Sequence, residues 1–132
     1  MAFVLLRLIA ALQIVLGVLY LAAPHWLLAQ MGHSAAAPDL AYPLGMLAAR
    51  FLAYGAGLWW VARAPQRHAL WIRLMALIQG IDLAVGVVYT AAGVLPLALS
   101  AFPMANAVWI ALACLWLTRS PSQDTPATLQ AA

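Results

Sequence analysis

The chain has 132 residues, of which 67% are hydrophobic and only 7% are charged, and its mean hydropathy is +0.98. Soluble domains are far less apolar, so the composition predicts an integral membrane protein with no separate soluble domain. The chain contains no Lys or Glu, and its formal net charge is +3. Its arginines stand at the ends of apolar stretches or inside them rather than on one basic face, which excludes a nucleic-acid-binding surface.

Four apolar stretches are long enough to cross a bilayer, because a spanning helix needs about 20 apolar residues. We therefore expect an all-α integral membrane protein, built as a four-transmembrane-helix bundle. Residues 1–119 form the transmembrane domain. Its helices are expected at about residues 2–22, 41–62, 68–92 and 98–118.

The segments outside these stretches are short. In the first connection, residues 26–31 can form a short helix lying in the membrane interface, ended by Gly32. We expect residues 33–39 to be a loop. Residues 120–132 are polar and contain proline, which predicts a disordered cytoplasmic tail.

Arginine placement predicts the orientation in the membrane. Arg63, Arg67 and Arg73 flank the second connection and Arg119 follows the fourth stretch, whereas the first and third connections contain no Lys or Arg. Positively charged connections stay on the cytoplasmic side. We therefore expect both termini in the cytoplasm. The protein is expected to be a multi-pass protein of the cytoplasmic, or inner, membrane.

The chain also shows internal similarity. Residues 8–23 align without gaps on residues 77–92, and this alignment pairs Gln13 with Asp82. The second and fourth stretches align as well, pairing Arg50 with Asn106. Each unit is a pair of helices, so the pattern indicates a possible parallel two-helix internal repeat.

One polar residue stands deep in each apolar stretch. Arg50 lies thirteen positions before Arg63, and Asp82 lies fifteen positions after Arg67, so both are about 20 Å from the ends that carry these arginines. We expect an Arg50–Asp82 ion pair because a charge inside a membrane usually finds a partner. The full polar layer is predicted to comprise Gln13, Arg50, Asp82 and Asn106, with Gln13 and Asn106 completing the hydrogen bonds of the pair.

Further residues are expected to support this layer. Tyr54 and Gln79 lie one helical turn away on the same faces and are predicted to contact it. Tyr20 and Tyr89 are expected to anchor the helices at the membrane interface. Small residues recur at every fourth position of the second and third helices, which predicts that these two helices pack most closely. The recurring positions are Gly45, Ala49, Ala53, Gly57, Ala76, Gly80 and Ala84.

The layer has two interpretations. It is either an ion-pair network that fixes which helices pair, or a binding or proton-coupling site, because ionisable residues inside membranes often mark ligand paths. No sequence pattern indicates a catalytic residue or a cofactor site, so we do not expect an enzyme. His25, His33 and Asp39 share the non-cytoplasmic side, but their spacing matches no strong metal-ligand pattern, and we expect no metal site.

The chain resembles the small bacterial four-helix membrane proteins of the DoxX-like superfamily. The resemblance rests on LRLIAALQIVLGVLYLAAP, on LGMLAARFLAYGAGLW and on RHALWIRLMALIQGIDLAVG. It implies an accessory membrane subunit associated with oxidoreductases or quinones.

Two functions are therefore expected. The first is a non-catalytic accessory or scaffolding subunit that meets another membrane protein or a copy of itself within the lipid bilayer. The alternative is a binder or carrier of a small lipophilic or quinone-like molecule at the polar layer.

Overall fold

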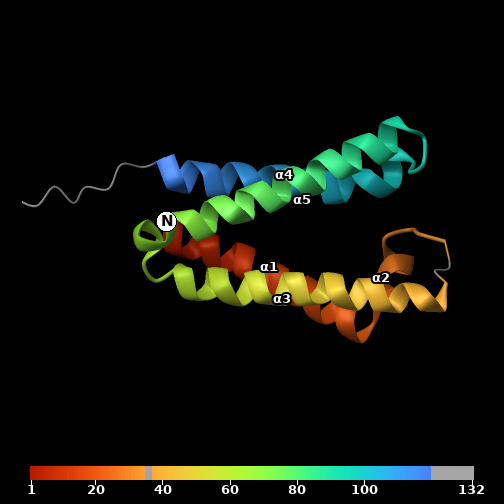
Figure 1. Ribbon diagram of the computed structural model, residues 1–132, viewed down its shortest axis with the longest axis horizontal. Coiled ribbons are helices and arrows are strands. Elements are labelled where there is room, and N and C mark those ends of the chain that lie inside the picture. The colour runs from red at the N-terminus through yellow and green to blue at the C-terminus, as the bar shows by residue number, and fades with distance from the viewer. Residues whose placement is uncertain (35–36, 120–132) are drawn as a thin grey trace, which may run out of the picture.

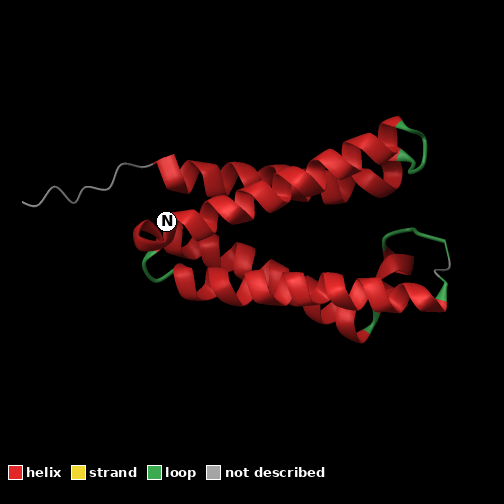
Figure 2. Ribbon diagram, in the orientation of Figure 1, coloured by secondary structure: helices red, strands yellow, loops and turns green. Residues whose placement is uncertain are grey.

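The computed structural model describes residues 1–34 and 37–119, and the described part is helical with short connecting loops (Figure 2). Four helices are long and apolar enough to cross a membrane. They are α1 (Ala2–Ala22), α3 (Ala41–Val61), α4 (Ala69–Ala91) and α5 (Leu97–Arg119). The prediction of an all-α chain with four helices of spanning length is confirmed, and the expected tail at 120–132 lies outside the described residues.

The connections contain short helical segments. The short helix α2 (Pro24–Gln30) follows α1, as the sequence predicts. A 3₁₀ turn, η1 (Pro38–Leu40), occupies the end of the segment expected to be a loop, and a second one, η2 (Pro65–His68), precedes α4. Proline stands at the first position of all three segments, where its fixed φ suits a helix start and its missing N–H costs no hydrogen bond.

The helices pack as two antiparallel pairs, α1 with α3 and α4 with α5. Figure 1 shows the two pairs close together at one end of the molecule and spread apart at the other. The N-terminus and the C-terminal end of α5 both lie at the close end, which we call the terminal end; the opposite end is the distal end. An even number of spans accounts for the two ends of the described chain being on the same side.

Glycine allows a close contact between α1 and α3. A Cβ placed on Gly55 would come within 2.6 Å of the Ile14 side chain and 3.0 Å of the Ala10 carbonyl oxygen, so α1 and α3 approach closely because Gly55 has no side chain. The expectation that α3 and α4 form the closest pair is wrong. Ala49 and Gly80, two of the small residues on which it rested, are exposed instead.

The hydrophobic core occupies the terminal half of the bundle. All four long helices contribute to it, so apolar side chains close this half. The distal half contains none of the core residues. The buried members of the core are Leu6, Ile9, Ala10, Leu58, Val61, Ala62, Ile72, Met75, Ala76, Ile110, Cys114 and Leu117.

Two glycines end helices at the distal end. Gly32 follows α2 with φ 84° and Gly93 follows α4 with φ 71°, in the left-handed region that glycine adopts without strain. After α2, the Gly32 N–H donates to the Ala29 carbonyl and the His33 N–H to the Leu28 carbonyl. These two hydrogen bonds form the Schellman pattern, which ends α2 at glycine.

Candidate ligand cavity

The predicted ion pair is present between α3 and α4. Nη2 of Arg50 lies 3.1 Å from Oδ1 and 2.9 Å from Oδ2 of Asp82. The two side chains are 36% and 32% exposed, respectively, so the pair is open on one side rather than enclosed. Since α3 and α4 belong to different helix pairs, this contact joins the two halves of the molecule where they begin to separate.

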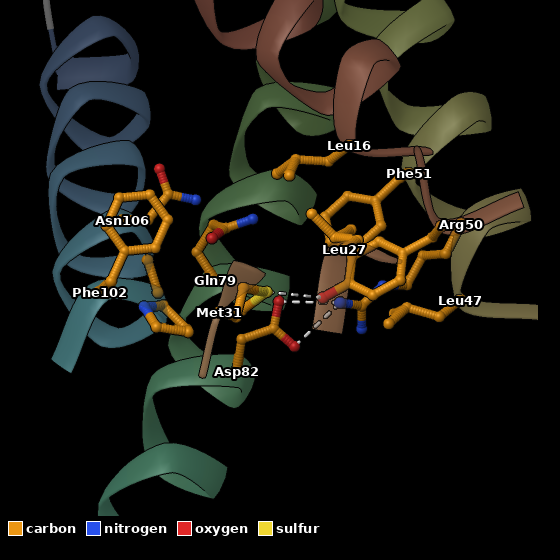
Figure 3. Close-up of a pocket in the computed structure, with 13 residues that line it drawn as sticks. Leu16, Leu27, Met31, Leu47, Arg50, Phe51, Gln79, Asp82, Phe102 and Asn106 are labelled. Atoms are coloured by element: carbon orange, nitrogen blue, oxygen red, sulfur yellow. Dashed lines mark hydrogen bonds and ion pairs between the residues drawn. The ribbon is translucent and has the colours of Figure 1, made fainter. Parts of the chain in front are cut away.

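The open side of the ion pair faces a cavity of about 280 Å³. Figure 3 shows Arg50 and Asp82 pointing toward one another, and Gln79 and Asn106 line the same cavity. Helices α1 to α5 all contribute side chains. The lining residues are Leu16, Tyr20, Leu27, Met31, Leu47, Arg50, Phe51, Gln79, Asp82, Phe102, Pro103, Asn106 and Ala107.

Two amides give the cavity further hydrogen-bonding capacity. The Asn106 Oδ1 accepts the indole N–H of Trp109 at 2.9 Å, and the Gln79 Nε2 donates to the sulfur of Met75 at 3.6 Å. An indole nitrogen only donates and a thioether only accepts, so the partners set the direction of each amide. The Nδ2 of Asn106 therefore remains a donor, and the Oε1 of Gln79 remains an acceptor.

Aromatic and aliphatic side chains form the rest of the wall. The ring of Tyr20 on α1 stacks on that of Phe51 on α3, with centroids 5.6 Å apart and planes 1° from parallel. The Tyr20 hydroxyl lies 3.9 Å from the sulfur of Met31, which follows α2. Tyr20 is thus half-buried against α3 and Met31, and its expected role as an interface anchor stays a prediction. Leu27, which is buried, brings α2 over the cavity.

Two of the expected layer contacts are absent. Among the described residues, neither Gln13 nor Asn106 donates or accepts a hydrogen bond with the ion pair. Asn106 bonds to Trp109 three residues along its own helix, a nearer partner than Asp82 on α4. Gln13 is 2% exposed and its Nε2 has no hydrogen-bond partner. It stands one turn toward the terminal end from Leu16, where packed side chains replace the cavity.

Tyr54 also lies away from the ion pair. Its ring packs on Trp71 with centroids 5.5 Å apart, and it borders the hydrophobic core. Of the two residues expected beside the layer, only Gln79 lines the cavity. One turn of α3 is enough to move a side chain from the open distal half to the closed terminal half.

Sequence reasoning missed the apolar lining, although helical spacing contains a signal for it. Leu47 lies three positions before Arg50 and four before Phe51. Phe102 lies four positions before Asn106. Positions three or four apart share a helix face. The residues contributed by α2 had no such signal, because nothing in the sequence shows how that helix folds back.

Metal binding has no support from the described residues, since no group of three or more His, Cys, Asp or Glu side chains comes together there. No protein-family model, curated protein or solved structure matches the chain. The resemblance to DoxX-like proteins therefore stays a prediction.

Proposed function

We propose that the protein binds or carries a small lipophilic molecule, quinone-like in size, in the cavity between its two helix pairs. The observation that carries this proposal is an ion pair whose open side faces an otherwise mostly apolar cavity inside a chain of membrane-spanning helices. The proposed role is non-catalytic.

The energetics favour an occupant. Charged groups in a membrane are costly unless they are paired and hydrogen-bonded, and about one third of each side chain of the pair remains open. A ligand that hydrogen-bonds to the open side of the Arg50–Asp82 pair gives a partner to donors that the apolar lining cannot satisfy. An engineered cavity of about 150 Å³ already holds benzene, so 280 Å³ accommodates a ring or a folded chain segment.

Native mass spectrometry after gentle extraction from the protein's own membranes tests the proposal. The wild-type chain is compared with Leu47→Trp, which fills the cavity, and with Met46→Trp, which adds the same side chain at an exposed neighbouring position. Circular dichroism verifies that both variants are helical.

We expect a discrete small-molecule mass on the wild type and on Met46→Trp, and its loss from Leu47→Trp. A wild-type chain that carries no such mass, or an adduct that Leu47→Trp retains, would contradict the proposal.

A second candidate function, the accessory or scaffolding subunit, is favoured by one face of α3. Ala49 and Ala53 are exposed, and a Cβ placed on Gly45 would meet nothing within 4 Å. Small residues on a lipid-facing surface let a helix of another chain approach closely. We propose this face as the contact with another membrane protein or a second copy of this chain.

Cysteine crosslinking in native membranes tests this second function. Ala49→Cys should form a crosslinked protein product with a short bifunctional reagent, and Ala48→Cys should not, because Ala48 and the natural Cys114 are both buried. The mass of the product distinguishes a second copy from another protein. The idea fails if Ala49→Cys yields only uncrosslinked chain.

A further inference from the structure

The hydrogen-bonding groups of the cavity define a class of ligand, and this inference rests on the proposed function. The first step concerns Arg50. Only its Nη2 contacts Asp82, whereas a guanidinium carries five N–H donors on three nitrogens. The N–H groups of Nη1 and Nε take no part in the ion pair, and the side chain that carries them is 36% exposed and lines the cavity.

The second step concerns charge. Arg50 and Asp82 cancel one another, and among the residues that the structure describes no other Asp or Arg lines the cavity. An anionic head group would bring an uncompensated negative charge into a low-dielectric site, and a cationic one would face the positive charge of Arg50. Desolvating an ion costs more free energy than a neutral hydrogen bond returns. The site therefore discriminates in favour of a neutral head group.

The third step concerns the balance of donors and acceptors. Arg50 and the Nδ2 of Asn106 offer donors, while Asp82 and the Oε1 of Gln79 offer acceptors. A ligand oxygen that only accepts would leave the Oε1 of Gln79 without a donor and would make no use of the lone pairs of Asp82 that Arg50 does not occupy. A hydroxyl group accepts from one side of this set and donates to the other.

We propose that the ligand is a neutral amphiphile with a hydroxyl head group, held with its hydroxyl at the Arg50–Asp82 pair and its apolar body against Phe51 and Phe102. An aliphatic alcohol and a phenol share this chemistry. A fatty acid, an alkylamine and a phospholipid do not.

The experiment measures the thermal unfolding midpoint of the full chain in a mild detergent, with each probe at the same mole fraction of the micelle. The probes are dodecan-1-ol, 4-octylphenol, 2-tridecanone, dodecanoate and dodecylamine. The alcohol and the phenol should raise the midpoint by about 3 °C or more. The ketone, which only accepts, should raise it less, and the two ions should not raise it. The larger of the two shifts identifies the alcohol or the phenol as the better fit.

Two variants locate the effect. In Gln79→Met, which keeps the shape of the side chain but removes the Oε1 acceptor, the advantage of the alcohol over the ketone should shrink by at least half. In Leu47→Trp all shifts should vanish, and in Met46→Trp they should equal those of the wild type.

The possible failures are distinguishable. If none of the five probes shifts the wild-type midpoint, the proposed function falls together with this inference. If dodecanoate or dodecylamine gives the largest shift, and Leu47→Trp abolishes it, the cavity is a ligand site but the hydroxyl assignment is wrong. An equal response to the alcohol and the ketone in the wild type also overturns that assignment.

Discussion

At the scale of single residues, the Arg50–Asp82 pair is the contact most sensitive to change. In Asp82→Asn the guanidinium loses its counter-charge while it remains in a largely apolar site. Because hydrogen bonds to charged groups contribute about 1.5 to 3 kcal/mol and this pair is partly open, we expect a loss of about 1 to 2 kcal/mol of stability. Thermal unfolding in detergent measures it. The double variant Arg50→Gln with Asp82→Asn should recover part of the loss, and a double variant that is less stable still would contradict this account.

Gln13, in contrast, is a residue whose replacement should raise the stability of the protein. It is buried with its Nε2 unpartnered, and a buried unsatisfied donor costs about 1 to 3 kcal/mol. Gln13→Met keeps the length of the side chain and removes the donor, so the unfolding midpoint should rise. A fall in the midpoint would mean that the amide has a partner in the membrane that the surrounding side chains do not provide.

The candidate site could be predicted from the sequence only in part, for reasons visible at these residues. Opposite charges at matching depth on two spans identified the Arg50–Asp82 pair, since so few partners exist inside a membrane. Depth alone did not identify the neighbours. Gln13, at a similar depth, lies among packed side chains, and Asn106 bonds within its own helix.

At the scale of helices, one glycine of α3 lies in a tight helix contact and one glycine of α4 lies on an open face. Gly55→Ala would push α3 away from the backbone of α1, and overpacking of this kind costs about 1 to 3 kcal/mol. Gly80→Ala meets nothing within 4 Å and should stabilise by up to about 1 kcal/mol through helix propensity. Chemical unfolding of the two variants compares them directly. Equal effects of the two substitutions would refute the assigned packing of α1 on α3.

The helices themselves could be predicted because length and hydropathy suffice to identify a span. Their pairing could not. Small residues recur on α3 and α4 alike, and the pattern does not say whether a small residue faces a neighbouring helix, as Gly55 does, or the outside, as Gly80 does. That choice depends on which helix supplies a complementary side chain, and Ile14 of α1 has no distinctive signal in the sequence.

At the scale of the whole molecule, two helix pairs are closed at the terminal end by the core and separate toward the distal end (Figure 1). The units of the predicted repeat, α1 with α3 and α4 with α5, are the same pairs that pack closely, and the duplication itself stays a prediction. The cavity then lies between the two units rather than within either.

The orientation in the membrane has its own test. Arg67 lies in η2, between α3 and α4, and Ser34 follows α2, so these two exposed residues are at opposite ends of the bundle. The natural Cys114 is buried and should give no background labelling. With a membrane-impermeant thiol reagent on intact cells, Ser34→Cys should react and Arg67→Cys should react only after the cells are opened. Labelling of Arg67→Cys in intact cells would reverse the proposed orientation.

The central claim is that a small molecule, and not membrane lipid alone, occupies the cavity in the living membrane. The most direct measurement places a photoreactive benzoylphenylalanine at Leu47, which lines the cavity, or at exposed Met46, and determines by mass spectrometry what each attaches to on irradiation of intact cells. The account predicts a discrete small-molecule adduct at Leu47 and no such adduct at Met46, which stands beside the small-residue face of α3 and should attach only to phospholipid or to a neighbouring chain. Phospholipid alone at both positions, or a second protein attached at Leu47, would contradict it.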